Sequence, residues 1–344
     1  MTRKERFLAA VRGEQPDRVP MFDFLFQQPM YKTLIGHEPG VYNTKDAVAC
    51  ALALDHDAVW LPFGGFNGFQ PEFLDENTYI DEWGTTFRQN DASWPIDAPI
   101  DYPIKSRQDL AAYQVPDATL PGRTSALEQF AQTEHDNLAL TGGVGGPFTT
   151  CWMLMGYERI CYALYDDPQM LTDIFRFVNE FNKEAARRSV EAGADAMWIS
   201  DDLGDSHCGF LKLDHFREYY LPHLVELTEY IDSLGVPALL HCCGQFGDYL
   251  PDLAQTKIAS IHPLQRTAGM DLRWVKEHYG QRFCIIGNVD SSRTLPFGTP
   301  EGVAAEAREA IDIAADMFPL YRYDAVMADN GPLMSPPGPA LSTE

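Results

Sequence analysis

The sequence predicts a (β/α)8 barrel, the TIM-barrel architecture, and three observations point to it. Eight short apolar segments are spread along the chain, and most of them follow a stretch with helical periodicity. Near-continuous apolar strands that alternate with helices are typical of a parallel sheet covered on both faces. The length of 344 residues suits one such domain. A doubly wound sheet is the alternative, weakened because no glycine-rich dinucleotide fingerprint follows the first predicted strand.

The eight predicted strands lie, in chain order, at residues 19–23, 57–62, 137–141, 195–200, 236–241, 258–262, 283–287 and 324–328. The longest helical stretch spans 168–192 and is followed by Gly193, a residue type that commonly ends helices. Segment 64–121 is the least regular, and its DEWGTTFRQN sequence predicts a β-hairpin inserted after the second strand. We expect one domain over residues 1–344 with a loose, proline-rich tail at 336–344.

Composition excludes several classes of function. The 26 lysines and arginines against 50 acidic residues give a net charge of −24, so no basic stripe exists for nucleic acid or an anionic membrane. The sequence contains no apolar run of signal-peptide or membrane-span length. Seven scattered cysteines do not resemble a disulfide framework, so we expect a reducing cytoplasm. Cys151, Cys161 and Cys284 are interpreted as core packing, and the oligomeric state is left open.

Polar residues follow the last five predicted strands, where a barrel of this type carries its functional groups. These residues are, in order, Ser200, Asp201 and Asp202; His241, Cys242 and Cys243; His262 and Gln265; Asn288 and Asp290; Asp329 and Asn330. Ordinary solvation explains scattered polar residues. It explains less well that five consecutive strands end in acids, amides, imidazoles and thiols.

The sharpest motif is His241-x-Cys243. Residues two apart on a strand project to the same side, so His241 and Cys243 could bind one metal while Cys242 points elsewhere. Imidazole and thiolate suit Zn²⁺, which then needs at least one further ligand from another strand. The alternative is a buried histidine beside two cysteines that pack as small apolar groups.

The neighbouring motifs are less specific. Of the pair Asp201-Asp202, one acid would cap the following segment and the other would face the barrel mouth. His207 and Cys208, in the loop after that strand, are weaker ligand candidates. The glycine-rich loop 142–147 could bring backbone amides close to a ligand, but it lacks the Lys-Ser/Thr of a P-loop.

Taken together, the motifs resemble the uroporphyrinogen decarboxylase superfamily, and most closely its corrinoid-dependent methyltransferase branch. That branch includes methylcobalamin:coenzyme M methyltransferases. The resemblance rests on eight segments in the family order: ERFLAAVRGEQPDRVP, DEWGTTF, GGPFTTCWMLMGYE, DDPQML, EAGADAMWISDDLG, LLHCCGQ, IIGNVD and LPFGTPEGV. It covers nearly the whole chain and implies the same (β/α)8 fold.

The resemblance also implies a chemistry. In the methyltransferase branch the HxC motif supplies two zinc ligands, which correspond here to His241 and Cys243. Zinc there binds and deprotonates a thiol, which takes the methyl group from methylcobalamin carried by a separate corrinoid protein. Other members pass the methyl group to tetrahydrofolate, with acids such as Asp202 or Asp290 positioning the pterin. The partners implied are thus a corrinoid protein and a small-molecule methyl acceptor.

From the strand ends and the resemblance together we assign roles to the remaining residues. Catalytic roles that shape the acceptor site are expected for Asp202, Asn288 and Asp290. Substrate contacts are expected for Asp201, His262, Gln265 and Asn330.

Two departures from the branch stand out. Its zinc-dependent members carry a further cysteine after strand eight, where this sequence has Ala328-Asp329-Asn330-Gly331. Asp329 is therefore expected as the third metal ligand, with an acid from strand four as the alternative. The family also continues past a Pro-Pro segment into a final helix. This sequence ends soon after Pro336-Pro337, so we expect a shortened or altered C-terminus.

Two other functions stay open. Decarboxylation of uroporphyrinogen, a polyanion, requires cationic side chains, yet the stretch after the first predicted strand, residues 22–28, contains none. The catalytic aspartate of those enzymes also has no counterpart in residues 59–63. A non-catalytic barrel that binds a corrinoid or tetrapyrrole is the second. The aromatic residues Phe22, Phe24, Phe26, Trp60 and Phe63 would suit a flat macrocycle or pterin, or would simply plug the barrel.

Overall fold

The computed structural model describes residues 1–26, 28–39, 43–89, 97–134 and 136–315. Its centre is a six-stranded parallel sheet in the order β1-β6-β7-β8-β9-β10. The strands are β1 (Ala58–Pro62), β6 (Ala139–Gly145), β7 (Ala196–Ser200), β8 (Ala238–His241), β9 (Ile258–His262) and β10 (Cys284–Ile285). Consecutive strands are neighbours, as expected for repeated βα units that wind in one direction.

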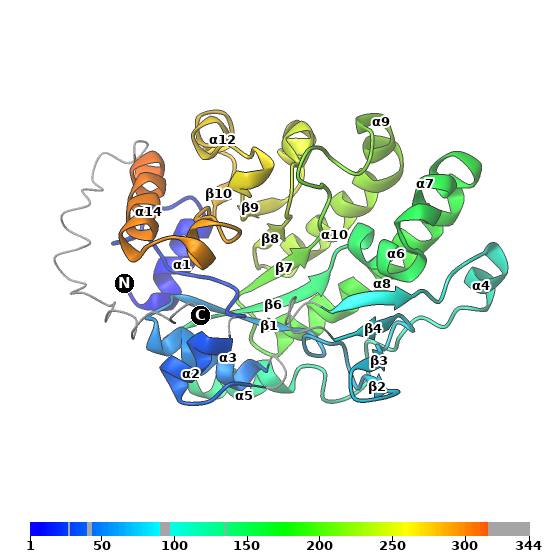
Figure 1. Ribbon diagram of the computed structural model, residues 1–344, viewed down its shortest axis with the longest axis horizontal. Coiled ribbons are helices and arrows are strands. Elements are labelled where there is room, and N and C mark those ends of the chain that lie inside the picture. Colours follow the sequence, from blue (N-terminus) through cyan, green and yellow to red (C-terminus); the bar gives the residue numbers. More distant parts are fainter. Residues whose placement is uncertain (27, 40–42, 90–96, 135, 316–344) are drawn as a thin grey trace, which may run out of the picture.

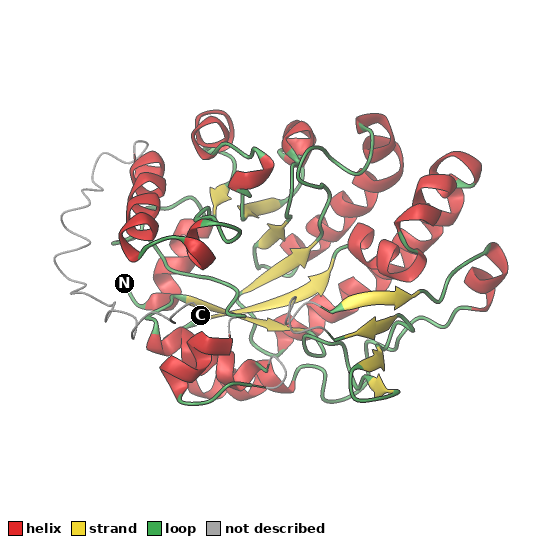
Figure 2. Ribbon diagram, in the orientation of Figure 1, coloured by secondary structure: helices red, strands yellow, loops and turns green. Residues whose placement is uncertain are grey.

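Helices lie around this sheet (Figures 1 and 2), with α2, α3 and α5 on one side and α9 and α12 on the other. The helices before β7 are α1 (Arg3–Val11), α2 (Gln28–Ile35), α3 (Thr44–Ala53), α4 (Arg107–Ala112), α5 (Ser125–Thr133), α6 (Pro147–Met155), α7 (Tyr157–Asp166) and α8 (Pro168–Glu191). Those after β7 are α9 (Leu213–His215), a π-helical turn (Phe216–Tyr220), α10 (Leu221–Ser233), α11 (Leu250–Leu253), α12 (Leu272–Tyr279), α13 (Thr294–Phe297) and α14 (Pro300–Ala315), with 3-10 turns at Gly247–Tyr249 and Arg266–Ala268. None of the helices within the described residues is both long and apolar enough to span a membrane.

Six of the eight predicted strands are confirmed, and the first is wrong as a strand. Residues 19–23 run without regular strand structure, because Pro20 lacks an N–H donor and the segment is held by other bonds. The eighth predicted strand, 324–328, lies outside the described residues, as do Asp329, Asn330 and the expected tail at 336–344. The described chain is therefore an α/β fold with an open six-stranded parallel sheet.

Buried Asp57 fixes the segment that replaces the first predicted strand. Its carboxylate lies 2.6 Å from an Arg6 nitrogen and 3.2 Å from an Arg18 nitrogen, and it accepts the Met21 N–H at 2.6 Å. Asp57 is fully buried, so these bonds replace the water that the carboxylate would otherwise need. The N-terminal end of β1 is thereby tied to α1 and to residues 18–21.

The predicted hairpin is confirmed and is part of a larger insertion, a four-stranded antiparallel sheet. Its strands are β2 (Glu72–Phe73), β3 (Thr78–Ile80), β4 (Thr86–Arg88) and β5 (Ala98–Asp101). The turn between β3 and β4 contains Gly84 at φ 81°, a left-handed conformation that glycine adopts without steric cost. Arg123, almost fully buried, joins the insertion to the main domain by an ion pair with Glu82 and by stacking on Phe69.

The parallel strands bury both faces, as their apolar sequences predict. One face packs against the helices in the main core. The other forms a smaller core in which Ala58, Ala139 and Ala196 lie beside fully buried Trp198, and Phe7 of α1 covers them. Alternate residues along each strand serve the two cores, which is the period of two expected of a strand. His241 lies two residues after Leu239 on β8, so its side chain is on the same face of the sheet as Leu239, the face of the smaller core.

Candidate metal centre

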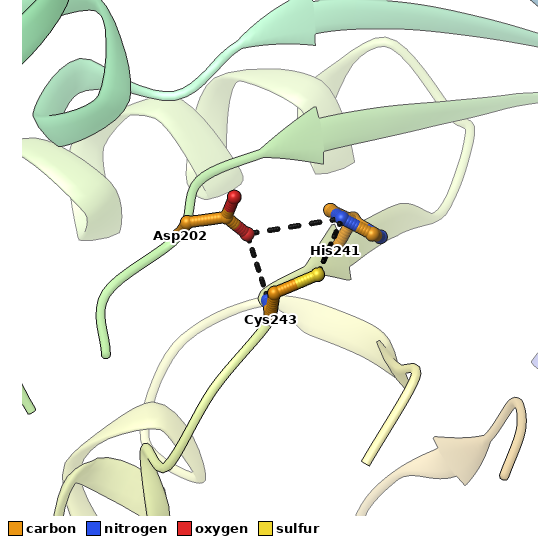
Figure 3. A group of neighbouring side chains, drawn as sticks. All are labelled: Asp202, His241 and Cys243. Atoms are coloured by element: carbon orange, nitrogen blue, oxygen red, sulfur yellow. Dashed lines mark hydrogen bonds and ion pairs between the residues drawn. The ribbon is translucent and has the colours of Figure 1, made fainter. Parts of the chain in front are cut away.

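Three side chains from neighbouring strand ends meet at the carboxyl edge of the parallel sheet (Figure 3). Asp202 follows β7, His241 is the last residue of β8, and Cys243 lies two residues further on. The register pairs Ser200 of β7 with His241 of β8, so the chain segments that carry the three groups leave the sheet side by side. Among the described residues these three form a group of His, Cys and acidic side chains whose donor atoms all lie within 4.8 Å of one another.

The distances within this group fit a metal ion. Cys243 Sγ is 3.4 Å from His241 Nε2, and that nitrogen is 3.7 Å from Asp202 Oδ1. Ligands of a tetrahedral Zn²⁺ are separated by about 3.4–3.6 Å, given the usual zinc–nitrogen, zinc–oxygen and zinc–sulfur bond lengths. Imidazole, thiolate and carboxylate are all zinc ligands, so the donor chemistry fits as well.

The alternation of side chains around β8 separates the two cysteines as predicted. Cys243 contacts His241, whereas Cys242 is fully buried and accepts the Leu203 N–H at 3.3 Å. The backbone N–H of Cys243 donates to Asp202 Oδ1 at 2.7 Å. Cys243 therefore orients the carboxylate beside it, while Cys242 packs the turn.

His241 is also held from the next strand. Its Nδ1 lies 2.8 Å from Nδ1 of His262, the last residue of β9, so one ring donates a proton and the other accepts it. Burial lowers the pKa of both imidazoles, and the effect is largest for His262, which also faces His241. Both rings are thus neutral near pH 7, the form in which histidine binds metals.

The same burial acts on Cys243. Desolvation first, and then the negative charge of Asp202, raise the pKa of the Cys243 thiol well above its ordinary value. Without a cation in the group this thiol stays protonated at neutral pH. A bound divalent ion would favour the thiolate instead.

Asp201 lies next to Asp202 in sequence but is not part of the group of three donors. Its carboxylate is fully buried and accepts the N–H groups of Thr149 at 2.6 Å and Phe148 at 3.3 Å, at the start of α6. The hydroxyl of Tyr220 donates to it at 2.5 Å. Burial outweighs these bonds and raises the pKa of Asp201 to about 6. Asp201 therefore caps α6, which precedes it in the chain, and not the segment that follows the pair, as we expected from the sequence.

Glycines make room for these side chains along β6. A Cβ on Gly146 would lie 2.0 Å from Asp201 Cγ, and one on Gly143 would lie 2.2 Å from the indole nitrogen of Trp60. The glycine-rich loop 142–147 thus has a packing reason. The N–H groups of Phe148 and Thr149, which follow this loop at the start of α6, donate to Asp201 and are therefore occupied.

Three further predicted residues lie on the loops after β9 and β10. Gln265 accepts the Gly244 N–H at 2.8 Å and so braces the loop after Cys243. Buried Asn288 donates to the Leu264 carbonyl at 3.1 Å, and its side-chain oxygen has no hydrogen-bond partner among the described residues. Asp290 accepts from the Ser292 N–H at 2.7 Å, which makes it a turn residue at the start of its loop.

The cysteines and the weaker ligand candidates can also be placed. Cys151 is buried as expected, and Cys284 is partly buried. The prediction that Cys161 packs in the core is wrong: it is exposed on α7, whose buried face is formed by residues such as Ile160 and Leu164. His207 and Cys208 are both exposed in the loop after β7 and lie outside the group of three donors.

Sequence reasoning missed the contact that Phe24 makes with the metal group. The Phe24 ring lies 5.3 Å, centre to centre, from both His241 and His262. Phe24 lies in the irregular segment that was predicted to begin as a strand. The alternation of Phe22, Phe24 and Phe26 was the available signal, because residues two apart in an extended chain share a side.

Three known proteins are similar to this chain. A methylcobamide:CoM methyltransferase from Methanosarcina acetivorans is 22% identical over 322 residues, which cover 92% of this chain and 91% of that protein. A uroporphyrinogen decarboxylase from Azoarcus sp. is 28% identical over 222 residues, covering 61% of this chain and 59% of that protein. The solved structure of a methyltransferase from Methanosarcina mazei superimposes with a TM-score of 0.73 at 22% identity, over 91% of this chain and 90% of that one.

The family is settled by a different comparison. Residues 89–319 match the family model described as uroporphyrinogen decarboxylase (URO-D), which is more than half of the chain. The match includes Asp202, His241 and Cys243, so the candidate metal centre lies inside the region that defines the family. The resemblance inferred from the sequence motifs is confirmed, and the protein is a member of the uroporphyrinogen decarboxylase family.

Proposed function

We propose that the protein is a methyltransferase that moves a methyl group between a corrinoid protein and a small thiol acceptor. The observation that carries the proposal is the group Asp202, His241 and Cys243, whose spacing fits one zinc ion. The full-length similarity to a methylcobamide:CoM methyltransferase supports it. Asp202 replaces Asp329 as the proposed third ligand, because it already lies within reach of the other two.

The residues of the chain would prepare this site in a defined way. If His241 held the metal through Nε2, its Nδ1 would carry the proton and would donate it to His262 Nδ1, which would fix the ring orientation. The Cys243 N–H holds one oxygen of Asp202 in place. Zinc, when bound, supplies a Lewis acid that lowers the pKa of the acceptor thiol.

The proposed reaction balances without a further reagent. The acceptor thiol loses its proton to solvent, and its sulfur forms a bond to the methyl carbon of methylcobalamin. The cobalt–carbon bond breaks and its electron pair stays on cobalt, which leaves cob(I)alamin and a methyl thioether. Tetrahydrofolate is the alternative acceptor within the same proposal. Asn288, whose buried side-chain oxygen lacks a hydrogen-bond partner in the described part of the chain, is the residue that we propose for acceptor contact.

We also infer that the sheet closes into a (β/α)8 barrel as one domain over residues 1–344. The open edges of the parallel sheet belong to β1 and β10. The fold likeness to the Methanosarcina mazei methyltransferase, at a TM-score of 0.73, supports closure.

Metal content and turnover test the proposal together. Protein purified without chelator should contain about one zinc per chain by elemental mass spectrometry. The substitutions His241→Ala and Cys243→Ala should each remove the zinc, and each should slow the transfer of methyl from free methylcobalamin to a thiol at least about 100-fold. Cys161→Ala is the matched control, since Cys161 is an exposed cysteine outside the group, and it should change neither quantity.

Two results would overturn the proposal. One is full methyl transfer by His241→Ala, since the site would then not carry the reaction. The other is decarboxylation of uroporphyrinogen by the wild type at a rate above that of methyl transfer. This rate is measured by chromatography of the oxidised porphyrins.

A further inference from the structure

Asp202, the proposed metal ligand on the β7 side, lies in a loop and not in the strand itself. β7 ends at Ser200, and Asp202 is the second residue beyond it. Its side chain is partly exposed, and the Cys243 N–H donates to its Oδ1 at 2.7 Å (Figure 3). A ligand on a loop keeps its geometry when the main chain that carries it is also held in place. The bonds of that main chain therefore decide how well the carboxylate is placed.

Three successive N–H groups hold the main chain at Asp202, and they lead in two directions. Those on either side of it, from Asp201 and Leu203, donate to the last carbonyl of β8 at 2.8 Å and to the Cys242 sulfur at 3.3 Å. Both bonds go to the β8 segment. The Asp202 N–H donates instead to Thr149 Oγ1, in α6, at 2.9 Å. Thr149 is thus the attachment of Asp202 on the side away from β8.

Thr149 also bonds to the other acid of the pair. Its N–H donates to Asp201 Oδ1 at 2.6 Å, while its hydroxyl oxygen accepts the Asp202 N–H. α6 follows β6, and β6 is the neighbour of β7 in the sheet. One threonine therefore joins the helix after β6 to both of the acids that follow β7.

The position of Thr149 is itself braced from a third direction. Asp201, which binds the Thr149 N–H, also accepts the hydroxyl of Tyr220 at 2.5 Å, and both side chains are fully buried. Tyr220 is the last residue of the π-helical turn, a kind of turn that is frequent at functional sites in proteins. A buried carboxylate that is bonded on both oxygens is held more firmly than an exposed one.

We propose that Thr149, braced by Asp201 and Tyr220, is a positioning residue of the metal centre. By accepting the Asp202 N–H it directs the Asp202 carboxylate towards His241 and Cys243. This inference rests on the metal site of the proposed function and assigns to that site a residue of α6. It does not depend on which acceptor takes the methyl group.

Zinc affinity tests the assignment directly. Thr149→Val keeps the branched shape of the side chain and removes the acceptor of the Asp202 N–H. It should weaken zinc binding about tenfold, measured by competition with a chromophoric chelator. Thr149→Ser retains the hydroxyl group and should bind zinc nearly as tightly as the wild type does. Wild-type affinity in Thr149→Val would overturn the inference.

The matched control makes the same replacement one residue further along α6. Thr150 is also a buried threonine, and the bonds to Asp201 and Asp202 described above do not involve it. Thr150→Val should therefore leave zinc affinity unchanged. A loss as large as that in Thr149→Val would mean that any change at the start of α6 disturbs the centre, which contradicts a specific role for Thr149.

A double substitution separates positioning from a general effect on the fold. If Thr149 acts through Asp202, then Thr149→Val should cause no further loss of zinc affinity once Asp202→Ala has removed the carboxylate. A tenfold loss on top of Asp202→Ala would show that Thr149 supports the site by another route, and the inference would fail.

Hydrogen exchange in the metal-free protein gives a result that does not depend on zinc. The Cys243 N–H reports on Asp202, because it donates to Asp202 Oδ1. Thr149→Val should speed exchange of this amide about tenfold, while the amides of α8 keep their wild-type rates. An unchanged rate at Cys243 overturns the inference. If the wild type binds no zinc, the proposed function fails, and this measurement still decides the role of Thr149.

Tyr220→Phe tests the brace and does not depend on the folding of the Thr149 variant. It removes one bond to Asp201 and leaves Thr149 and Asp202 in place. The loss of zinc affinity should be smaller than in Thr149→Val, about threefold, because the change is one bond further from the ligand. Wild-type affinity and wild-type exchange at Cys243 in a folded Tyr220→Phe variant would contradict the brace.

Discussion

Ionisable side chains gather at both ends of the parallel sheet. At one end the charges are paired with each other, and at the other end they are not. At the N-terminal end, fully buried Asp57 is neutralised by Arg6 and Arg18. At the carboxyl end, Asp202 is 42% exposed and faces an imidazole and a thiol. Charges that are paired within the chain hold a segment in place. Donors that have no countercharge among the described residues keep their capacity to bind a ligand.

The largest effect on folding should come from breaking the paired end. Asp57→Ala removes the acceptor shared by Arg6, Arg18 and Met21, and should lower the free energy of unfolding by about 3–5 kcal/mol, measured in urea. Asp17→Ala is the control: Asp17 also pairs with Arg6 but is 42% exposed, so it should cost less than about 1 kcal/mol. Similar losses from both substitutions would show that burial does not distinguish the two acids.

The opposite end should respond in the opposite manner. Asp202→Asn removes a proposed ligand but no buried ion pair, so the metal-free protein should keep its free energy of unfolding within about 0.5 kcal/mol. Zinc affinity, measured by competition with a chromophoric chelator, should fall by more than about 100-fold. Asp205→Asn, which alters an exposed acid three residues away, should leave the affinity unchanged. Unaltered affinity in Asp202→Asn would return the third-ligand role to Asp329.

His262 sharpens the comparison, because it contacts the proposed metal centre at His241. His262→Leu introduces an apolar side chain of similar size and removes the Nδ1 partner, and it should weaken zinc binding about 10- to 100-fold. His262→Gln offers an amide oxygen to the His241 Nδ1–H and should recover part of the loss. If both variants bind zinc as tightly as the wild type does, the contact does not position His241 and His262 is only a packing residue.

Much of this arrangement could be predicted from the sequence, because it depends on local periodicity. The alternation along a strand placed His241 and Cys243 together and sent Cys242 elsewhere. The DEWGTTFRQN sequence located the hairpin. Period-two and turn patterns act between residues that are neighbours in the chain, so they can be read without knowing the fold.

The choice between acids could not be predicted. Asp201 and Asp202 are adjacent and identical in type, and only the docking of α6 decides which of them is buried. Asp329, the expected third ligand, lies outside the described residues, and the register of β7 and β8 places Asp202, an acid of the alternative strand, beside His241. The failure of residues 19–23 as a strand has the same origin, because the bonds of that segment go to Asp57, 36 residues from Met21.

The smallest expected effect is on the pH dependence of stability, and it comes from Asp81. Unlike Asp57 and Asp202, this acid is paired with neither an arginine nor a proposed metal. Asp81, in the turn of the hairpin, accepts the N–H groups of Trp83 and Thr85 at 3.0 and 2.9 Å. Burial outweighs these bonds and raises the pKa of Asp81 to about 7. The folded protein therefore holds a proton at pH 5–6 that the unfolded chain has already released.

It follows that this carboxyl contributes most stability below pH 4, and that the contribution is lost as the pH rises towards 7. Asp81→Asn keeps an oxygen that can accept the same N–H groups but has no charge to desolvate. Urea unfolding at several values between pH 4 and 8 should therefore show the variant gaining on the wild type as the pH rises, by about 1 kcal/mol or less. Parallel stability curves for the two proteins would mean that the turn amides alone keep Asp81 ionised. Asp81 would then resemble a capping acid more than the unpaired Asp202.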